Sequence, residues 1–160
     1  MKSLSYLFLT TLILAGSCKT SKVDLKQLDN NGEVILSMER TACFGSCPVF
    51  EAKLYSNGLL LYNGKMFTQH TGCGYAEVPK AEIAQLLEYV KEAGFFNLEN
   101  KYPINEQAPS DLPGCHLYIK SGANEKRIED EGWETPSALT AIQNRVDSLI
   151  LTKKLHFCDK

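Results

Sequence analysis

The sequence lacks the short motifs that mark the common enzyme classes. It contains no Gly-x-Ser-x-Gly elbow, no His-Glu-x-x-His pair, no phosphate-binding loop and no dinucleotide-binding fingerprint. Ser46 stands at no recognisable spacing from a histidine and an aspartate, and the chain has only three histidines. These absences argue against a serine hydrolase, a zinc peptidase and a nucleotide-dependent enzyme. We therefore expect a protein without catalytic activity.

A strong charge of one sign is also missing. The 160 residues include 17 Lys and Arg against 19 Asp and Glu, which gives a formal net charge of −2. Arginine occurs only at positions 40, 127 and 145, so no basic stripe is available to follow a phosphate backbone. A nucleic-acid partner is not expected.

No apolar run is long enough to span a bilayer, which needs about 20 residues. A shorter run fills residues 4–14, after Lys2 and before the small residues Ala15-Gly16-Ser17 and Cys18. A positive start, an apolar segment and a small-residue exit are typical of a secretory signal. A cysteine directly after them resembles the bacterial lipoprotein box, which implies cleavage before Cys18 and attachment of lipid to that residue.

These features predict how the chain is divided and where it resides. Residues 1–17 are expected to be a lipoprotein signal peptide, 18–32 a lipidated tether, 33–152 a single domain and 153–160 a C-terminal tail. Acyl chains on Cys18 would hold the protein at a membrane. No acidic cluster follows Cys18, which favours the periplasmic face of the outer membrane over the cell surface. The expected partners are that membrane, through the lipid, and a protein of the cell envelope.

Five cysteines remain once the lipidated one is set aside. An exported chain meets oxidising conditions, so disulfides are the default interpretation of these residues. Two of them flank a short glycine-containing loop, which can bring their Cα atoms into disulfide range. We predict one disulfide between Cys43 and Cys47, a second between Cys73 and Cys115, and an unpaired Cys158.

Two metal interpretations compete with the disulfides. The Cys-x-x-x-Cys-Pro motif resembles the copper-binding and thiol-redox motif of the Sco family of respiratory assembly proteins, and soft thiolates suit Cu(I). The candidate ligands are Cys43, Cys47 and His70. Those proteins have a helix after the motif, whereas residues 49–55 here alternate as a strand does. A zinc site is the other interpretation, and its ligands would include His70, Cys73, Cys115 and His116. The disulfide interpretation requires no cofactor.

Hydrophobic periodicity predicts strands followed by a helix, and this order occurs twice. Asn57-Gly58 predicts a tight hairpin turn between two strands. Apolar residues at three- and four-residue spacing predict helices that open at Pro79 and Pro136, with Thr135 as the cap of the second. We expect an α+β fold, in which two helices pack on one face of an antiparallel sheet of about five strands. Alternation marks strands within residues 34–39, 50–55 and 115–120, and the turn signals place further strands within residues 59–62, 66–78 and 125–130.

The longest stretch without periodicity runs from Asn97 to Gly114. A loop of this length in a small domain is usually functional or loosely ordered. The candidate binding residues are Tyr102 and Asp111 in this loop and Trp133 in a later turn. Asp111 has a structural alternative as the cap of a turn, and Trp133 has one as a cover over the edge of the core.

Several segments of the chain resemble the domain-of-unknown-function 6438 family, which is found mainly in lipoproteins of the Bacteroidota. The similarity covers about residues 33–151, and Cys73, Cys115 and Cys158 lie outside its pattern. The family has no assigned activity, so the resemblance supports the domain bounds and implies no reaction. We expect a lipid-anchored envelope protein that acts as a binding or structural module, with a thiol-redox or Cu(I)-handling protein as the alternative. The matching segments are Cys43–Phe50, Leu54–Gly58, Tyr62–Lys65, Ala93–Leu98, Asp111–Pro113 and Glu134–Leu139.

Overall fold

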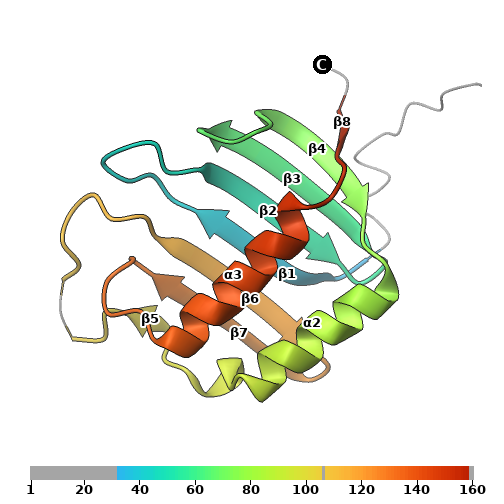
Figure 1. The fold of residues 1–160 in the computed structure, drawn as a ribbon. Coiled ribbons are helices and arrows are strands. Elements are labelled where there is room, and N and C mark those ends of the chain that lie inside the picture. The colour runs from blue at the N-terminus through green and yellow to red at the C-terminus, as the bar shows by residue number, and fades with distance from the viewer. Residues whose placement is uncertain (1–31, 106, 159–160) are drawn as a thin grey trace, which may run out of the picture.

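Two α-helices cover one face of a curved, eight-stranded sheet (Figure 1). The computed structural model describes residues 32–105 and 107–158, so the predictions for residues 1–31, including the signal peptide and Cys18, lie outside the described residues. The helices are α2 (Lys80–Glu92) and α3 (Ser137–Leu151), with a short 3-10 helix η2 (Phe95–Asn97) after α2. The strands are β1 (Val34–Arg40), β2 (Val49–Tyr55), β3 (Leu59–Met66), β4 (Gly72–Glu77), β5 (Lys101–Tyr102), β6 (Cys115–Ser121), β7 (Asn124–Asp130) and β8 (His156–Phe157).

The α+β class and the two helices on one face agree with the sequence, whereas the sheet differs in detail. Its strand order is β5-β7-β6-β1-β2-β3-β4-β8, and β5 pairs with β7 in parallel while the other pairs are antiparallel. The sheet is therefore mixed and has eight strands rather than about five. The two edge strands, β5 and β8, are only two residues long, which is too short for an alternating pattern to reveal them.

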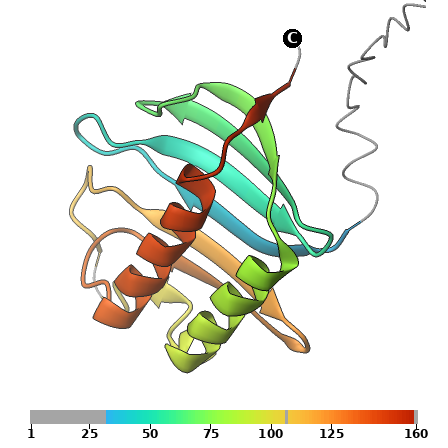
Figure 2. The ribbon, with the colours of Figure 1, turned by 45° about the vertical axis from the view of Figure 1, so that its right-hand side comes forward.

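Helices α2 and α3 lie on the same side of the sheet, and the core fills the space between them and the sheet (Figure 2). Leu36 of β1 lies opposite Leu54 on one side and Ile119 on the other, and all three are at most 1% exposed. Burial of each such side chain stabilises the fold by about 1.5–3 kcal/mol. The register is fixed because a one-residue slip would turn this apolar set toward solvent. From the helices, the core receives Ile83, Leu86, Val90, Leu139, Ile142, Val146 and Ile150.

Both helices begin directly after the prolines that the sequence indicates. Pro79 precedes α2 and Pro136 precedes α3, but neither helix has a side-chain cap hydrogen bond. The prediction that Thr135 caps α3 is wrong, because its Oγ1 donates a hydrogen bond to Asp130 Oδ1 at 2.7 Å instead. Within the part of the chain that the structure describes, no helix has both the length and the apolar character needed to cross a membrane.

One of the two predicted disulfides is present, and the other joins a different pair of cysteines. Cys43 and Cys47 are joined as predicted, with their Cα atoms 5.7 Å apart. The predicted Cys73–Cys115 disulfide is wrong, because Cys73 is joined to Cys158 and Cys115 is the free, buried cysteine of the described residues. Strands β4 and β6 are four positions apart in the sheet. At ~4.8 Å between strands they lie about 19 Å apart, beyond the roughly 7 Å that a disulfide can span.

The Cys73–Cys158 disulfide ties the C-terminal segment to the edge of the sheet. The backbone N–H of Cys158 also donates to the Cys73 carbonyl at 3.2 Å, and β8 pairs with β4 just before this point. The residues after α3 therefore form part of the domain structure up to Cys158.

We predict that the two disulfides stabilise the fold unequally. Their sequence separations are 85 residues for Cys73–Cys158 and 4 residues for Cys43–Cys47. Closure of the longer loop removes more freedom from the unfolded chain, so loss of Cys73–Cys158 should cost about 4–5 kcal/mol and loss of Cys43–Cys47 about 2 kcal/mol. Denaturant unfolding of the double variants C73S/C158S and C43S/C47S measures both values. A larger loss for the short loop would contradict this explanation.

Candidate functional site

Four connecting segments meet at one edge of the molecule, where β1, β3 and β7 end and β2, β4 and β6 begin. Arg40 at the end of β1 lies opposite Phe50 of β2 and Cys115 of β6, and Val49 lies opposite Met66. Antiparallel pairing therefore brings these segments to the same edge. We call the described residues 41–48, 67–71, 103–105, 107–114 and 131–136 the loop rim. It contains the predicted site residues Cys43, Cys47, His70, Asp111 and Trp133.

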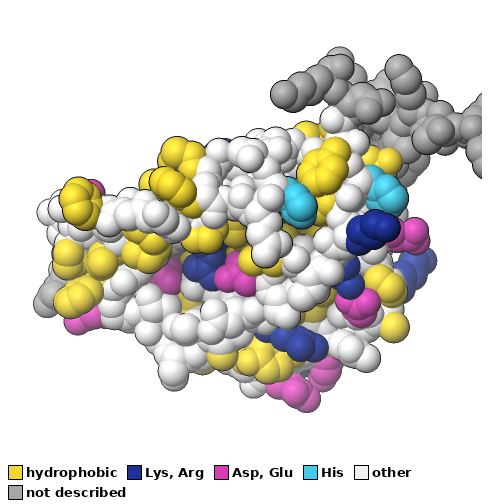
Figure 3. Space-filling model, turned by 45° about the horizontal axis from the view of Figure 1, so that its top comes forward, with side chains coloured by type: hydrophobic (Ala, Val, Ile, Leu, Met, Phe, Trp, Pro, Cys, Tyr) yellow, Lys and Arg dark blue, Asp and Glu magenta, His cyan; other side chains and the backbone are white. Residues whose placement is uncertain are grey.

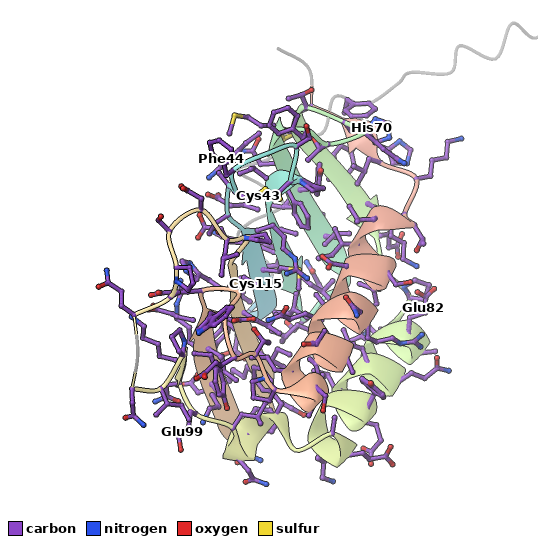
Figure 4. The ribbon with its side chains drawn as sticks, turned by 60° about the vertical axis from the view of Figure 1, so that its left-hand side comes forward. Cys43, Phe44, His70, Glu82, Glu99 and Cys115 are labelled. Carbon is purple, nitrogen blue, oxygen red and sulfur yellow. A yellow bond between two sulfur atoms is a disulfide. The ribbon has the colours of Figure 1, made fainter. Side chains whose placement is uncertain are left out.

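The Cys43–Cys47 disulfide closes a tight turn that presents Phe44 to solvent. The Gly45 N–H donates to the Cys43 carbonyl at 2.8 Å, and the Phe44 N–H donates to the Asp111 carbonyl at 2.9 Å. The Phe44 side chain is 90% exposed and points away from the sheet (Figure 4). The disulfide and the hydrogen bond to Asp111 thus fix the backbone of Phe44, while its large aromatic side chain is exposed to solvent.

The long non-periodic segment packs directly against the disulfide loop. The Thr41 N–H donates to the Gly114 carbonyl at 3.1 Å, and the Gly114 N–H donates to Thr41 Oγ1 at 2.8 Å. A Cβ at position 114 would lie 2.8 Å from both Thr41 Oγ1 and the Asp130 carbonyl oxygen, so only glycine fits there. An open, largely polar hollow of about 230 Å³ lies between these segments, and its lining includes Asp111 and His116.

Backbone strain is concentrated in the loop rim. Three non-glycine residues of the described chain have a positive φ, namely Phe67 at 52°, Asp111 at 74° and Glu134 at 55°. Aspartate tolerates this conformation, but for a bulky side chain such as phenylalanine it is a true outlier. Such strain costs on the order of 1–3 kcal/mol per residue and tends to occur at functional sites.

A buried polar network beneath the rim joins the sheet to α3. The Asp130 side chain is 3% exposed and accepts three hydrogen bonds, from the Gly132 N–H at 2.9 Å, Thr135 Oγ1 at 2.7 Å and Gln143 Nε2 at 2.7 Å. Arg40 of β1 donates to Gln143 Oε1 at 3.2 Å and forms an ion pair with Asp147 of α3. Among the described residues, no buried side-chain nitrogen or oxygen lacks a hydrogen-bond partner. The network is therefore complete without a ligand.

The free thiol of Cys115 lies in β6 between the strands that carry Arg40 and Asp130. Burial raises the pKa of Cys115 to about 12, which the positive charge of Arg40 partly opposes and the negative charges of Asp147 and Asp130 reinforce. Burial by itself lowers the pKa of Arg40, but its hydrogen bond and charge interaction with Asp147 leave that pKa raised. Because only the thiolate is a good nucleophile or metal ligand, Cys115 is chemically inert near neutral pH.

The structure does not bring the proposed metal ligands together. The sulfurs of Cys43 and Cys47 bond to each other, and a strand, β2, follows the motif instead of a helix. The His70 ring lies edge-on to Phe157, with ring centroids 5.1 Å apart. Across the described ranges, no group of three His, Cys, Asp or Glu side chains is arranged to hold a metal ion. Of the zinc candidates, Cys73 is in a disulfide and His116 lies with Nδ1 3.3 Å from Glu39 Oε2.

The candidate binding residues of the sequence have different positions in the structure. Tyr102 is 5% exposed and its hydroxyl accepts a hydrogen bond from the Glu99 N–H at 3.0 Å, so it belongs to the core rather than to a binding surface. Asp111 contributes through its carbonyl, which holds Phe44. Trp133 is 42% exposed in the rim. The exposure of Phe44 and the buried role of Asp130 were both missed, because each depends on contacts between distant segments.

We predict that Asp130→Asn destabilises the fold by about 2–4 kcal/mol. The amide would place an N–H where the carboxylate now accepts a hydrogen bond. It would also remove the negative charge of Asp130, which strengthens the hydrogen bonds from the three buried donors. The neighbouring Glu129→Gln is the matched control, because Glu129 is about half exposed and should change stability by at most about 0.5 kcal/mol. Denaturant unfolding of both variants measures the difference. Equal effects would show that the network does not stabilise the fold.

We predict that Cys115 resists alkylation in the folded protein. With a pKa of about 12, roughly 10⁻⁴ of the thiol is ionised at pH 8, against about a quarter for an ordinary cysteine. Alkylation by iodoacetamide should therefore be at least a thousandfold slower than in the same chain in 6 M guanidinium, as measured by peptide mass spectrometry. Labelling of the folded protein within minutes would contradict this.

Comparison with known proteins places the chain in a family. No curated protein matches it. A family model described as a domain of unknown function, DUF6438, matches residues 34–150. These bounds run from the first residue of β1 almost to the end of α3, and they include the whole loop rim. Since the match covers well over half of the 160 residues, the chain belongs to the DUF6438 family, as the sequence motifs predict.

Proposed function

We propose that this protein is a lipid-anchored, non-enzymatic binding module of the cell envelope, and that the loop rim is its binding surface. The observation that carries the proposal is Phe44, which is 90% exposed although its backbone is fixed by a disulfide and by a hydrogen bond to Asp111. Exposed aromatic side chains on a rigid backbone are typical anchors of protein interfaces, because little conformational freedom is lost on binding.

The other exposed hydrophobic side chains support the same surface. Five of the eight large ones that the structure describes lie in the rim or directly beside it. Figure 3 shows hydrophobic side chains gathered in patches on one side of the molecule. Exposed hydrophobic residues that gather in one region mark interaction sites, whereas single ones need no explanation. The five are Phe44, Met66, Phe67, Ile104 and Trp133.

The chemistry beneath the rim favours binding over catalysis. Asp130 uses its two carboxylate oxygens on three structural hydrogen bonds, and Arg40 is engaged by Gln143 and Asp147. The Cys115 thiol is protonated at neutral pH because of its raised pKa. These groups hold the loops in place and are not poised to transfer a proton or attack a substrate.

The path of the chain supports presentation of the rim away from the anchor. The tether enters the domain at Glu33, whose N–H donates to Ser56 Oγ at 3.1 Å and whose carbonyl accepts from the Ser56 N–H at 2.8 Å. Ser56 lies in the β2–β3 turn, at the opposite end of the strands from the rim. With lipid on Cys18 in the outer membrane, the rim would face the periplasm and meet a protein partner there.

The alternative, a thiol-redox or Cu(I)-handling protein, has weaker support. The motif cysteines are joined to each other, and β2 occupies the place where the copper-handling proteins have a helix. Nothing in the positions of His70 and the two sulfurs favours a shared site.

A photocrosslinking experiment on the full chain in its native cells tests the proposal. A benzoylphenylalanine at position 44 should give a discrete crosslinked species, because this side chain would lie in the interface. The same residue at position 89, on α2, is the matched control, since Tyr89 is also an exposed aromatic but lies away from the rim. We expect at least fivefold more adduct from position 44, and loss of that adduct in the C43S/C47S variant.

The anchor is tested in the same cells. The Cys18→Ala variant should move from the membrane fraction to the soluble fraction. Equal crosslinking from positions 44 and 89 would refute the binding surface, and membrane retention of Cys18→Ala would refute the lipid anchor.

A further inference from the structure

The loop rim contains a cavity as well as exposed side chains. The cavity measures about 220 Å³ and opens between the 67–70 segment and the C-terminal end of α3. Figure 4 shows Phe44 and His70, which lines the cavity, at the same end of the molecule, so both features belong to one surface. The lining is mainly apolar, and its principal residues are Tyr62, Phe67, His70, Ile150, Leu151 and Leu155.

The cavity has the size and the chemistry of a site for one aromatic ring. An apolar cavity of about 150 Å³ is large enough to bind benzene, so a cavity of about 220 Å³ accepts a phenyl ring and the methylene that carries it. The rings of Tyr62, Phe67 and His70 in its wall offer edge-on or offset packing to an inserted ring. Lys153, which also lines the cavity, is paired with Glu82 of α2, so the cavity favours an uncharged group.

Phe44 is a projecting side chain of matching size. It is 90% exposed on a backbone that the Cys43–Cys47 disulfide and the Asp111 carbonyl hold in place. It does not line the cavity of its own chain, whereas a second copy of the chain presents the same cavity at the same rim. The molecule therefore carries both halves of a contact in which the phenylalanine of one copy fills the cavity of another.

The exposed apolar surface around the cavity is sufficient for a dimer. Phe44, Phe67 and Phe157 are 90%, 60% and 52% exposed. Since a large aromatic side chain has roughly 150–250 Å² of surface, these three expose roughly 300–500 Å² in each copy and roughly 600–1,000 Å² in two copies. Met66 and Leu151, each about half exposed, bring the total to the roughly 1,000–1,200 Å² at which specific interfaces begin. A formal net charge of only −2 gives little repulsion between two copies.

We propose that the loop rim joins two copies of this chain in a two-fold symmetric dimer, in which Phe44 of each copy fills the cavity of the other. This inference rests on the proposed function, because it names the partner of the same surface. Phe44 and the cavity lie at the end of the strands opposite Glu33, which is bonded to Ser56. A two-fold axis along the strands would therefore place the copies side by side, with Glu33 of both at the end that faces the membrane. Two-fold dimers are the commonest oligomers, and their contacts are reciprocal in this way.

Photocrosslinking of the full chain in its native cells identifies the partner. With benzoylphenylalanine at position 44, we expect an adduct of twice the chain mass that contains a co-expressed copy with a different tag. The crosslinked peptides should include residues 67–70 or 150–155 of that second copy. An adduct with a different protein would overturn the dimer and leave the proposed binding surface in place, whereas absence of any adduct would overturn both.

Complementary variants test the reciprocal contact in the detergent-solubilised full chain. Phe44→Ser removes the projecting ring, and Phe67→Asn removes part of the cavity wall while it relieves the positive φ at position 67, so both variants should fold. Each variant alone should weaken the dimer at least tenfold in sedimentation equilibrium, because no intact contact remains. An equimolar mixture should form a heterodimer at least fivefold tighter than either variant alone, since Phe44 of one chain can fill the intact cavity of the other.

Tyr89→Ser is the matched control for these variants. Tyr89 is an exposed aromatic on α2 outside the rim and the cavity lining, so its loss should leave the dimer as strong as in the parent chain. A dimer that survives Phe44→Ser, or a mixture no tighter than the single variants, would refute the insertion of Phe44 into the cavity. A parent chain that sediments as a monomer would refute the dimer itself.

Discussion

The buried carboxylate of Asp130 is the constraint on which the arrangement of the loop rim depends. It lies where β7 ends, and its hydrogen bonds reach the backbone of Gly132, the hydroxyl of Thr135 and the side chain of Gln143 in α3. The strand, the connection to the helix and the helix itself are thereby held by one group. A carboxylate in the core is tolerable only when its acceptor positions are filled, so each of these three partners also has a fixed place.

The effects of this network extend to the exposed aromatic side chains. Gly114 fits between Thr41 and the Asp130 backbone, and a Cβ at Gly132 would lie 2.5 Å from the Pro113 carbonyl oxygen, so the 107–114 and 131–136 segments are in close contact. The first of these segments holds Phe44 in turn through the Asp111 carbonyl. A chain of backbone contacts thus runs from the core to the rim. It offsets the strain of the left-handed residues and keeps the exposed side chains in a single arrangement.

Periodicity and turn residues in the sequence were sufficient to predict the features that form between neighbours in the chain. The Asn57-Gly58 hairpin, the helices after Pro79 and Pro136, and the Cys43–Cys47 disulfide all involve neighbours in the chain. The Cys73–Cys158 disulfide could not be predicted, because it depends on the return of the chain past β4 after α3. Thr135 was misassigned for a similar reason, since a buried carboxylate from another element competes for its hydroxyl. Exposure of Phe44 and burial of Tyr102 likewise follow from packing between distant segments.

Function is expected at the rim because the other surfaces of the sheet are covered by helices or by polar side chains that are paired with each other. The helices cover one face, and the open face consists largely of polar and charged side chains that pair across strands, such as Lys65 with Glu51 and Tyr118 with Glu125. The far end holds Glu33, near the start of the described chain, and Lys120 forms an ion pair with it. Within residues 32–105 and 107–158, the loop rim is where exposed apolar side chains occur together with a strained backbone that is held by hydrogen bonds between segments. An anchored protein that must reach a partner away from its membrane would need such a surface at the end opposite its tether.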